Sequence, residues 1–165
     1  MKFKELMMSS ENLMINDKPM KTIILVWGAS ERGKSQSIKR LAMTMPFSSF
    51  ISPWHNDDYD SYVIGTVKDQ DGKEHIVGIE SQGDPYSNQK VWIEKCIAAD
   101  SEVIVAASRT YGQTVRDACQ LAHDNGYEVV EVTTHFHVGG PKLSNGADLR
   151  DVFAENMVNL ILKLL

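Results

Sequence analysis

The chain has little cysteine and no long apolar run. Cys96 and Cys119 are its only cysteines, and two thiols are too few for the disulfide framework of small secreted domains. No stretch approaches the roughly 20 consecutive apolar residues that span a bilayer, and the first ten residues mix charged, polar and apolar types. We therefore expect a cytoplasmic protein without a signal peptide or membrane span, whose two cysteines are buried free thiols in helices.

Positive charge is scarce as well. Lysine and arginine number 17 against 22 aspartates and glutamates, which leaves a net charge of −5 at pH 7. Nucleic-acid-binding proteins generally carry a basic excess, so we do not expect nucleic acid as a bulk ligand. A length of 165 residues, with 42% of them hydrophobic, suffices for one domain with its own core. We expect that domain to cover residues 1–165, with residues 1–20 as an N-terminal extension or an edge strand.

What the sequence does contain is a phosphate-binding loop pattern. Residues 28–35 match G-x-x-x-x-G-K-[ST] at every fixed position. Gly28 and Gly33 permit backbone angles and close approaches that a Cβ would block, so the loop can turn its N–H groups toward phosphate oxygens. Lys34, expected on an exposed loop, can reach the β- and γ-phosphates, and the Ser35 hydroxyl can bind Mg²⁺. The residues expected to bind the nucleotide are Gly28, Ala29, Ser30, Glu31, Arg32, Gly33, Lys34, Ser35 and Gln36.

The segments on either side of this loop have the right character. Residues 21–27 form a short apolar run rich in β-branched side chains, which is typical of a fully buried strand. Residues 34–43 have the apolar spacing of a helix that buries one face. A strand, a loop and a helix are the setting that the motif requires, because the helix N-terminus adds partial positive charge beneath the phosphates.

The rest of the chain alternates between strand and helix patterns. Residues 61–67 and 73–79 flank a turn-forming segment and predict a β-hairpin. The other elements expected are a short extended segment at 50–54, strands at 101–108 and 127–132, and helices at 85–99, 114–125 and 149–164. This alternation predicts an α/β fold: a three-layer α/β/α sandwich with a mostly parallel sheet and one β-hairpin.

A magnesium nucleotide site also needs a carboxylate at the end of a neighbouring strand. The apolar run that begins at His75 ends in Glu80, which we expect to be the metal-side acid, with Asp84 as the alternative. Arg109 follows the strand at 101–108 and is expected to stabilise charge on the γ-phosphate. An ordinary surface salt bridge is the alternative role for this arginine.

These motifs together resemble those of small P-loop NTPases. The loop, the helix, the hairpin and then E-x-x-G at 80–83 follow the order that leads to D-x-x-G in small GTPases. The resemblance implies that Glu80 acts on Mg²⁺ through water and that Gly83 senses the γ-phosphate. The chain departs from the GTPase pattern at 107–113, where it has no guanine-reading N-K-x-D. ATP is therefore expected rather than GTP, and the similarity extends to nucleotide kinases.

Three functions are consistent with this sequence. The first is Mg²⁺-dependent binding and hydrolysis of a nucleoside triphosphate, with Lys34, Glu80 and Arg109 as catalytic residues and with Ser35 and Glu80 at the metal. The second is a small-molecule or nucleotide kinase, and the third is a module that binds nucleotide without turnover. In the kinase the acceptor would be contacted by Arg109 or by an acidic residue among Asp57, Asp58 and Asp60. The hydrolase would act on a protein partner.

Overall fold

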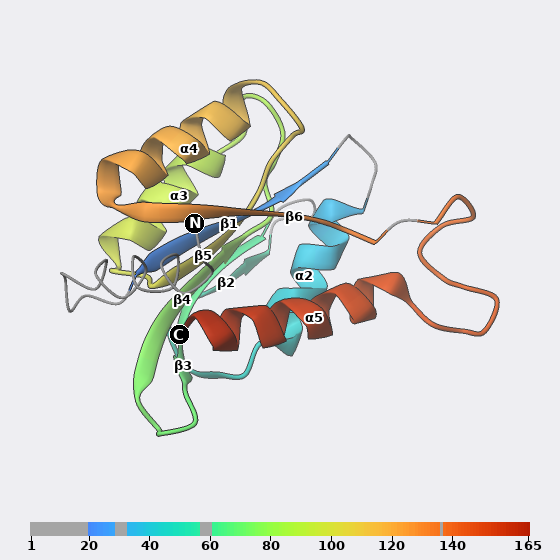
Figure 1. Ribbon diagram of the computed structural model, residues 1–165, viewed down its shortest axis with the longest axis horizontal. Helices are drawn as coiled ribbons and strands as arrows, with labels where there is room; N and C mark the ends of the chain where they lie inside the picture. The colour runs from blue at the N-terminus through green and yellow to red at the C-terminus, as the bar shows by residue number, and fades with distance from the viewer. Residues whose placement is uncertain (1–19, 29–32, 57–60, 136) are drawn as a thin grey trace, which may run out of the picture.

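The computed structural model describes residues 20–28, 33–56, 61–135 and 137–165 (Figure 1). Within these ranges no helix is long and apolar enough to cross a bilayer. The expected N-terminal extension or edge strand lies outside the described residues. The elements in chain order are β1 (Lys21–Trp27), α2 (Lys34–Thr44), β2 (Phe47–Asn56), β3 (Ser61–Lys68), β4 (Glu74–Glu80), α3 (Gln89–Ala98), β5 (Val103–Ala107), α4 (Gln113–Asn125), β6 (Tyr127–Thr133) and α5 (Leu149–Leu164).

The strands form one mixed sheet in the order β2-β3-β4-β5-β1-β6. The pairs β4–β5, β5–β1 and β1–β6 are parallel, whereas β2–β3 and β3–β4 are antiparallel. The predicted α/β class and the predicted hairpin, which is β3–β4, are therefore confirmed. Strand β1 lies between two parallel partners, with Ile24 opposite both Val105 and Val130, which explains its continuous apolar sequence.

Helices pack against both faces of this sheet. Successive side chains of a strand point to opposite faces, so Ile24 and Val26 enter one apolar core, while Ile23 and Leu25 enter the other. Helices α2 and α5 cover the first core, and α3 and α4 cover the second (Figure 1). The helical side chains buried in these cores include Ile38, Leu41, Phe153, Met157 and Ile161 on one face and Ile93, Cys96, Ala118 and Ala122 on the other.

Three local expectations were wrong. Helix α3 begins at Gln89 rather than near residue 85, because Tyr86 has a positive φ of 62° that a helix does not allow. Strand β2 is longer than the segment at 50–54. Cys96 is buried, which raises the pKa of its thiol to about 12, but Cys119 is exposed. Cys119 lies off the face of α4 that buries Thr114, Ala118 and Ala122.

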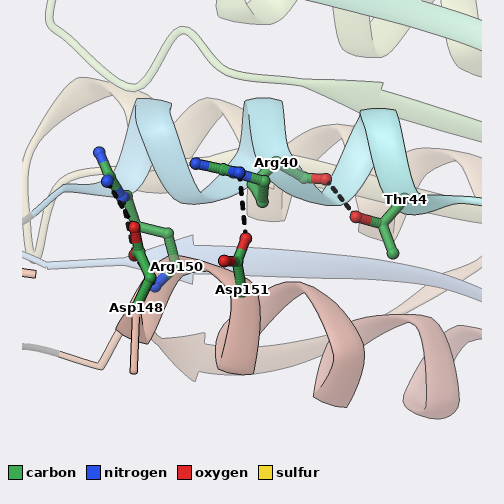
Figure 2. Close-up of polar contacts among 5 residues, drawn as sticks. All are labelled: Arg40, Thr44, Asp148, Arg150 and Asp151. Atoms are coloured by element: carbon green, nitrogen blue, oxygen red, sulfur yellow. Dashed lines mark hydrogen bonds and ion pairs between the residues drawn. The ribbon is translucent and has the colours of Figure 1, made fainter. Parts of the chain in front are cut away.

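Helix α2 is also joined to α5 by an ion pair (Figure 2). Arg40 on α2 forms an ion pair of 3.2 Å with Asp151 in the first turn of α5. Asp148 caps α5 by accepting a hydrogen bond from the Arg150 N–H at 2.9 Å. The Arg150 guanidinium also holds the pKa of Asp148 well below its usual range. The ion pair therefore links the two helices, and the Asp148–Arg150 contacts order the first turn of α5.

A buried histidine links chain segments at the amino-terminal ends of β4 and β5. His75 is 2% exposed and lies between two carboxylates, with Nδ1 2.8 Å from Glu102 and Nε2 2.9 Å from Asp69. Burial alone would lower the pKa of His75, but the bonds and charges of the two carboxylates outweigh it and raise the pKa above 6.5. The hydrogen bond from His75 in turn lowers the pKa of Asp69. His75 therefore joins the β3–β4 turn to the start of β5.

We expect His75→Gln to lower the free energy of unfolding by on the order of 2 kcal/mol, because it removes hydrogen bonds between charged groups. A raised folded-state pKa of His75 means that its stabilisation is complete below pH 6.5 and is lost as pH rises through that pKa. Because the pKa of Asp69 is lowered in the folded state, the stabilisation that Asp69 contributes is present above pH 3.8. It is lost as the pH falls through the folded-state pKa of Asp69.

Urea titrations across this pH range measure the effect. The difference between wild type and His75→Gln should be largest between pH 3.8 and 6.5 and should shrink at alkaline pH. His123→Gln is the matched control, since the His123 side chain is 86% exposed on α4. A difference that does not change with pH would contradict the protonated state of His75.

Candidate functional site

The carboxyl ends of four parallel strands meet at one edge of the sheet. The chain leaves this edge at Gly28 after β1, Ser81 after β4, Ser108 after β5 and Thr134 after β6. Sheets of this kind bind ligands outside the carboxyl ends of their strands. The nucleotide-binding residues expected from the sequence that the structure describes at this edge are Gly28, Gly33, Lys34, Ser35 and Gln36. Ala29, Ser30, Glu31 and Arg32 lie outside the described residues, as do Asp57, Asp58 and Asp60.

Lys34 is folded back onto the start of the loop. Its Nζ donates a hydrogen bond of 2.7 Å to the Gly28 carbonyl, and the residue is 8% exposed. The expectation of an exposed lysine was therefore wrong, because the first turn of α2 carries this side chain against the end of β1. Gly33 precedes the helix with a left-handed φ of 73°, a conformation that glycine adopts without strain. Gln36, in the same turn, is exposed.

Ser35 connects α2 to the end of β4. Its Oγ donates to the Ser81 carbonyl at 3.2 Å, and Ser81 directly follows Glu80. The hydroxyl expected to bind a metal thus lies beside the strand end that carries the expected acid. However, β4 is not the direct neighbour of β1 that we expected, because β5 lies between them. The two halves of the site meet through the segment after β4 rather than through adjacent strands.

The Glu80 carboxylate is fully buried, at 0% exposure. Oε1 accepts a hydrogen bond from the Ala107 N–H at 2.7 Å, and Oε2 accepts one from the Gln82 N–H at 2.8 Å. The backbone register between β4 and β5 ends at Ile79 and Val105. The carboxylate therefore extends the contact between these strands beyond their backbone pairing.

Gln89 also contacts the end of β5, and sequence patterns did not identify it. This side chain is 1% exposed, and its Nε2 donates to the Ala107 carbonyl at 2.7 Å. A Cβ on Gly83 would lie 2.9 Å from the Ser108 nitrogen, so glycine allows the segment after β4 to pack on the end of β5. The helical spacing of Gln89 with Trp92 and Cys96 could have indicated a buried position.

Arg109 lies two residues beyond the end of β5 and forms an ion pair with Asp84. Its Nη2 is 2.7 Å from Asp84 Oδ1, and the two side chains are 27% and 75% exposed. Its backbone N–H donates to Thr114 at 3.2 Å. Burial lowers the pKa of Lys34, the charge of Arg109 lowers it further, and Asp84 raises it. Lys34, Asp84 and Arg109 therefore act on one another electrostatically across this edge of the sheet.

Comparisons of the chain with protein-family models, with curated proteins and with solved structures found no match. The function is therefore inferred from the residues at this edge. A lysine and a serine at a helix start lie there close to a buried carboxylate, an exposed carboxylate and an arginine.

We expect Glu80→Gln to destabilise the fold by roughly 1–3 kcal/mol, because one of the two N–H groups that Glu80 accepts from then faces an amide NH₂ instead of an acceptor. The free energy of unfolding from urea titration tests this. Glu74→Gln on the exposed start of the same strand is the matched control. Equal stability of wild type and Glu80→Gln would show that the hydrogen bonds at the end of β4 contribute little.

Proposed function

We propose that this protein binds a nucleoside triphosphate together with Mg²⁺ at the carboxyl edge of its sheet and hydrolyses it, with ATP favoured over GTP. One observation carries the proposal. The loop sequence 28–35 runs from the end of a central parallel strand into a helix whose first residues are Lys34 and Ser35. Backbone N–H groups at such a helix start, the helix dipole and a lysine together favour phosphate.

The side chains of the edge fit the remaining parts of this chemistry. A serine hydroxyl and a neighbouring carbonyl are oxygen groups of the type that Mg²⁺ prefers, and they meet where Ser35 contacts Ser81. Bound Mg²⁺ would supply positive charge that neutralises the phosphate oxygens. Glu80, whose orientation is held by two N–H groups, is proposed as the metal-side acid. Arg109 is proposed to stabilise charge on the transferred phosphoryl group.

The arrangement of the helices is consistent with the same proposal. Two helices on each face of the sheet support a three-layer α/β/α sandwich of the P-loop NTPase type. We also propose that the protein is cytoplasmic and acts on a protein or small-molecule partner.

A nucleotide-binding module without turnover is the second candidate. The burial of Glu80 and the use of both its oxygens by backbone N–H groups favour this alternative, because a catalytic metal needs accessible oxygen ligands.

Purified protein incubated with Mg²⁺ and γ-labelled ATP or GTP distinguishes the candidates. Release of labelled phosphate supports the hydrolase, and transfer of label to an added small molecule or nucleotide supports the kinase. Tight binding without turnover supports the module. The absence of binding to either nucleotide would refute the proposal.

Lys34→Ala should lower the affinity for ATP by more than tenfold, because it removes a charge-assisted contact to the phosphates. Isothermal titration calorimetry measures this affinity. Lys39→Ala, on the same helix α2, is the control and should bind like wild type. Since Lys34 is buried and bonded to Gly28, the unfolding midpoint of each variant must be measured as well. Unchanged ATP affinity in a folded Lys34→Ala protein would refute the assignment of the loop.

A further inference from the structure

Asp84 occupies an unusual place at this edge, because it is an acidic side chain beside a site proposed for phosphate. It lies 2.7 Å from the Arg109 guanidinium and is 75% exposed. It also acts on Lys34, whose pKa it raises. An anionic side chain in this position opposes the binding of a phosphate chain unless that chain replaces it.

Arg109, the partner of Asp84, has N–H donors that their ion pair does not use. A guanidinium carries five N–H donors in a planar fork, and the ion pair joins Asp84 to Nη2 of Arg109. Nε of Arg109 is buried and has no hydrogen-bond partner within the described part of the chain. A phosphate has three oxygens that can accept from such a fork, and Arg–phosphate pairs are frequently bidentate. Phosphate therefore satisfies this arginine more fully than the single contact with Asp84.

The backbone beneath Arg109 is held in place. Ala107 is fixed through both its N–H and its carbonyl, by Glu80 and by Gln89, and the N–H of Arg109 itself is bonded to Thr114. Arg109 can therefore exchange one partner for another by a movement of side chains alone, while the end of β5 stays in place.

We propose that Asp84 is an internal substitute for the terminal phosphate: it neutralises Arg109 while the site is empty, and a nucleoside triphosphate must displace it. Asp84 thereby sets how strongly the site discriminates triphosphate from diphosphate, since the diphosphate has no terminal group to take its place. This inference rests on the proposed nucleotide binding.

A double-mutant cycle tests the exchange. The affinities of wild type, Asp84→Asn, Arg109→Gln and the double variant for ATP and ADP are measured by calorimetry, with Mg²⁺ and with a chelator. Asp84→Asn should bind ATP about fivefold more tightly or better, within the range of ordinary coupling between sites, while its affinity for ADP changes less than twofold. The double variant should bind ATP like Arg109→Gln, because Asp84 then has no arginine to release.

The remaining outcomes overturn the inference in distinguishable ways. A gain in ATP affinity that persists in the double variant would show that Asp84 acts by general repulsion, without Arg109. A loss of Mg²⁺-dependent affinity in Asp84→Asn would make Asp84 the metal-side acid instead. Equal ATP affinity in wild type and Asp84→Asn would overturn the inference while leaving the proposed function intact. No binding by wild type would overturn both. Asp124→Asn, an exposed aspartate on α4, controls for the change in net charge.

Discussion

The arrangement at the carboxyl edge depends on one buried carboxylate. Glu80 stands where the pairing of β4 with β5 stops, and its oxygens accept N–H groups from the end of β5 and from the segment that follows β4. A buried polar group is tolerated when its hydrogen bonds are made, and here those bonds join two chain segments that have no backbone ladder between them. The position of Ser81 beside Ser35 and the position of Arg109 beside Asp84 both follow from this junction.

Much of the fold could be predicted because its signals are local. The strand at 21–27 has the bounds of β1, the hairpin joins β3 to β4, and Gly126 ends α4 in a left-handed conformation after Asn125. Each of these features is encoded within about fifteen residues by apolar periodicity or turn chemistry. The proximity of Lys34, Ser35, Asp84 and Arg109 could also be anticipated, because parallel strands bring their carboxyl ends to one edge.

What could not be predicted depends on contacts between distant segments. Nothing in the sequence of β5 indicates that it separates β1 from β4. The burial of Lys34 and the exposure of Cys119 depend on how a helix is rotated against the sheet. The sequence favoured Glu80 over Asp84 as the metal-side acid, but it did not indicate that backbone donors enclose Glu80 while Asp84 faces solvent and an arginine.

The strand order also has a consequence for how the protein forms as it leaves the ribosome. Strand β1 is made before its neighbours β5 and β6, which begin at Val103 and Tyr127. Its apolar residues Ile23 to Val26 therefore lack their partner strands until β5 and β6 have been made. At roughly 5–20 residues per second, that interval lasts several seconds, and unpaired apolar strand edges are prone to association during it. The nascent chain must keep this strand from other chains until β5 and β6 have been translated.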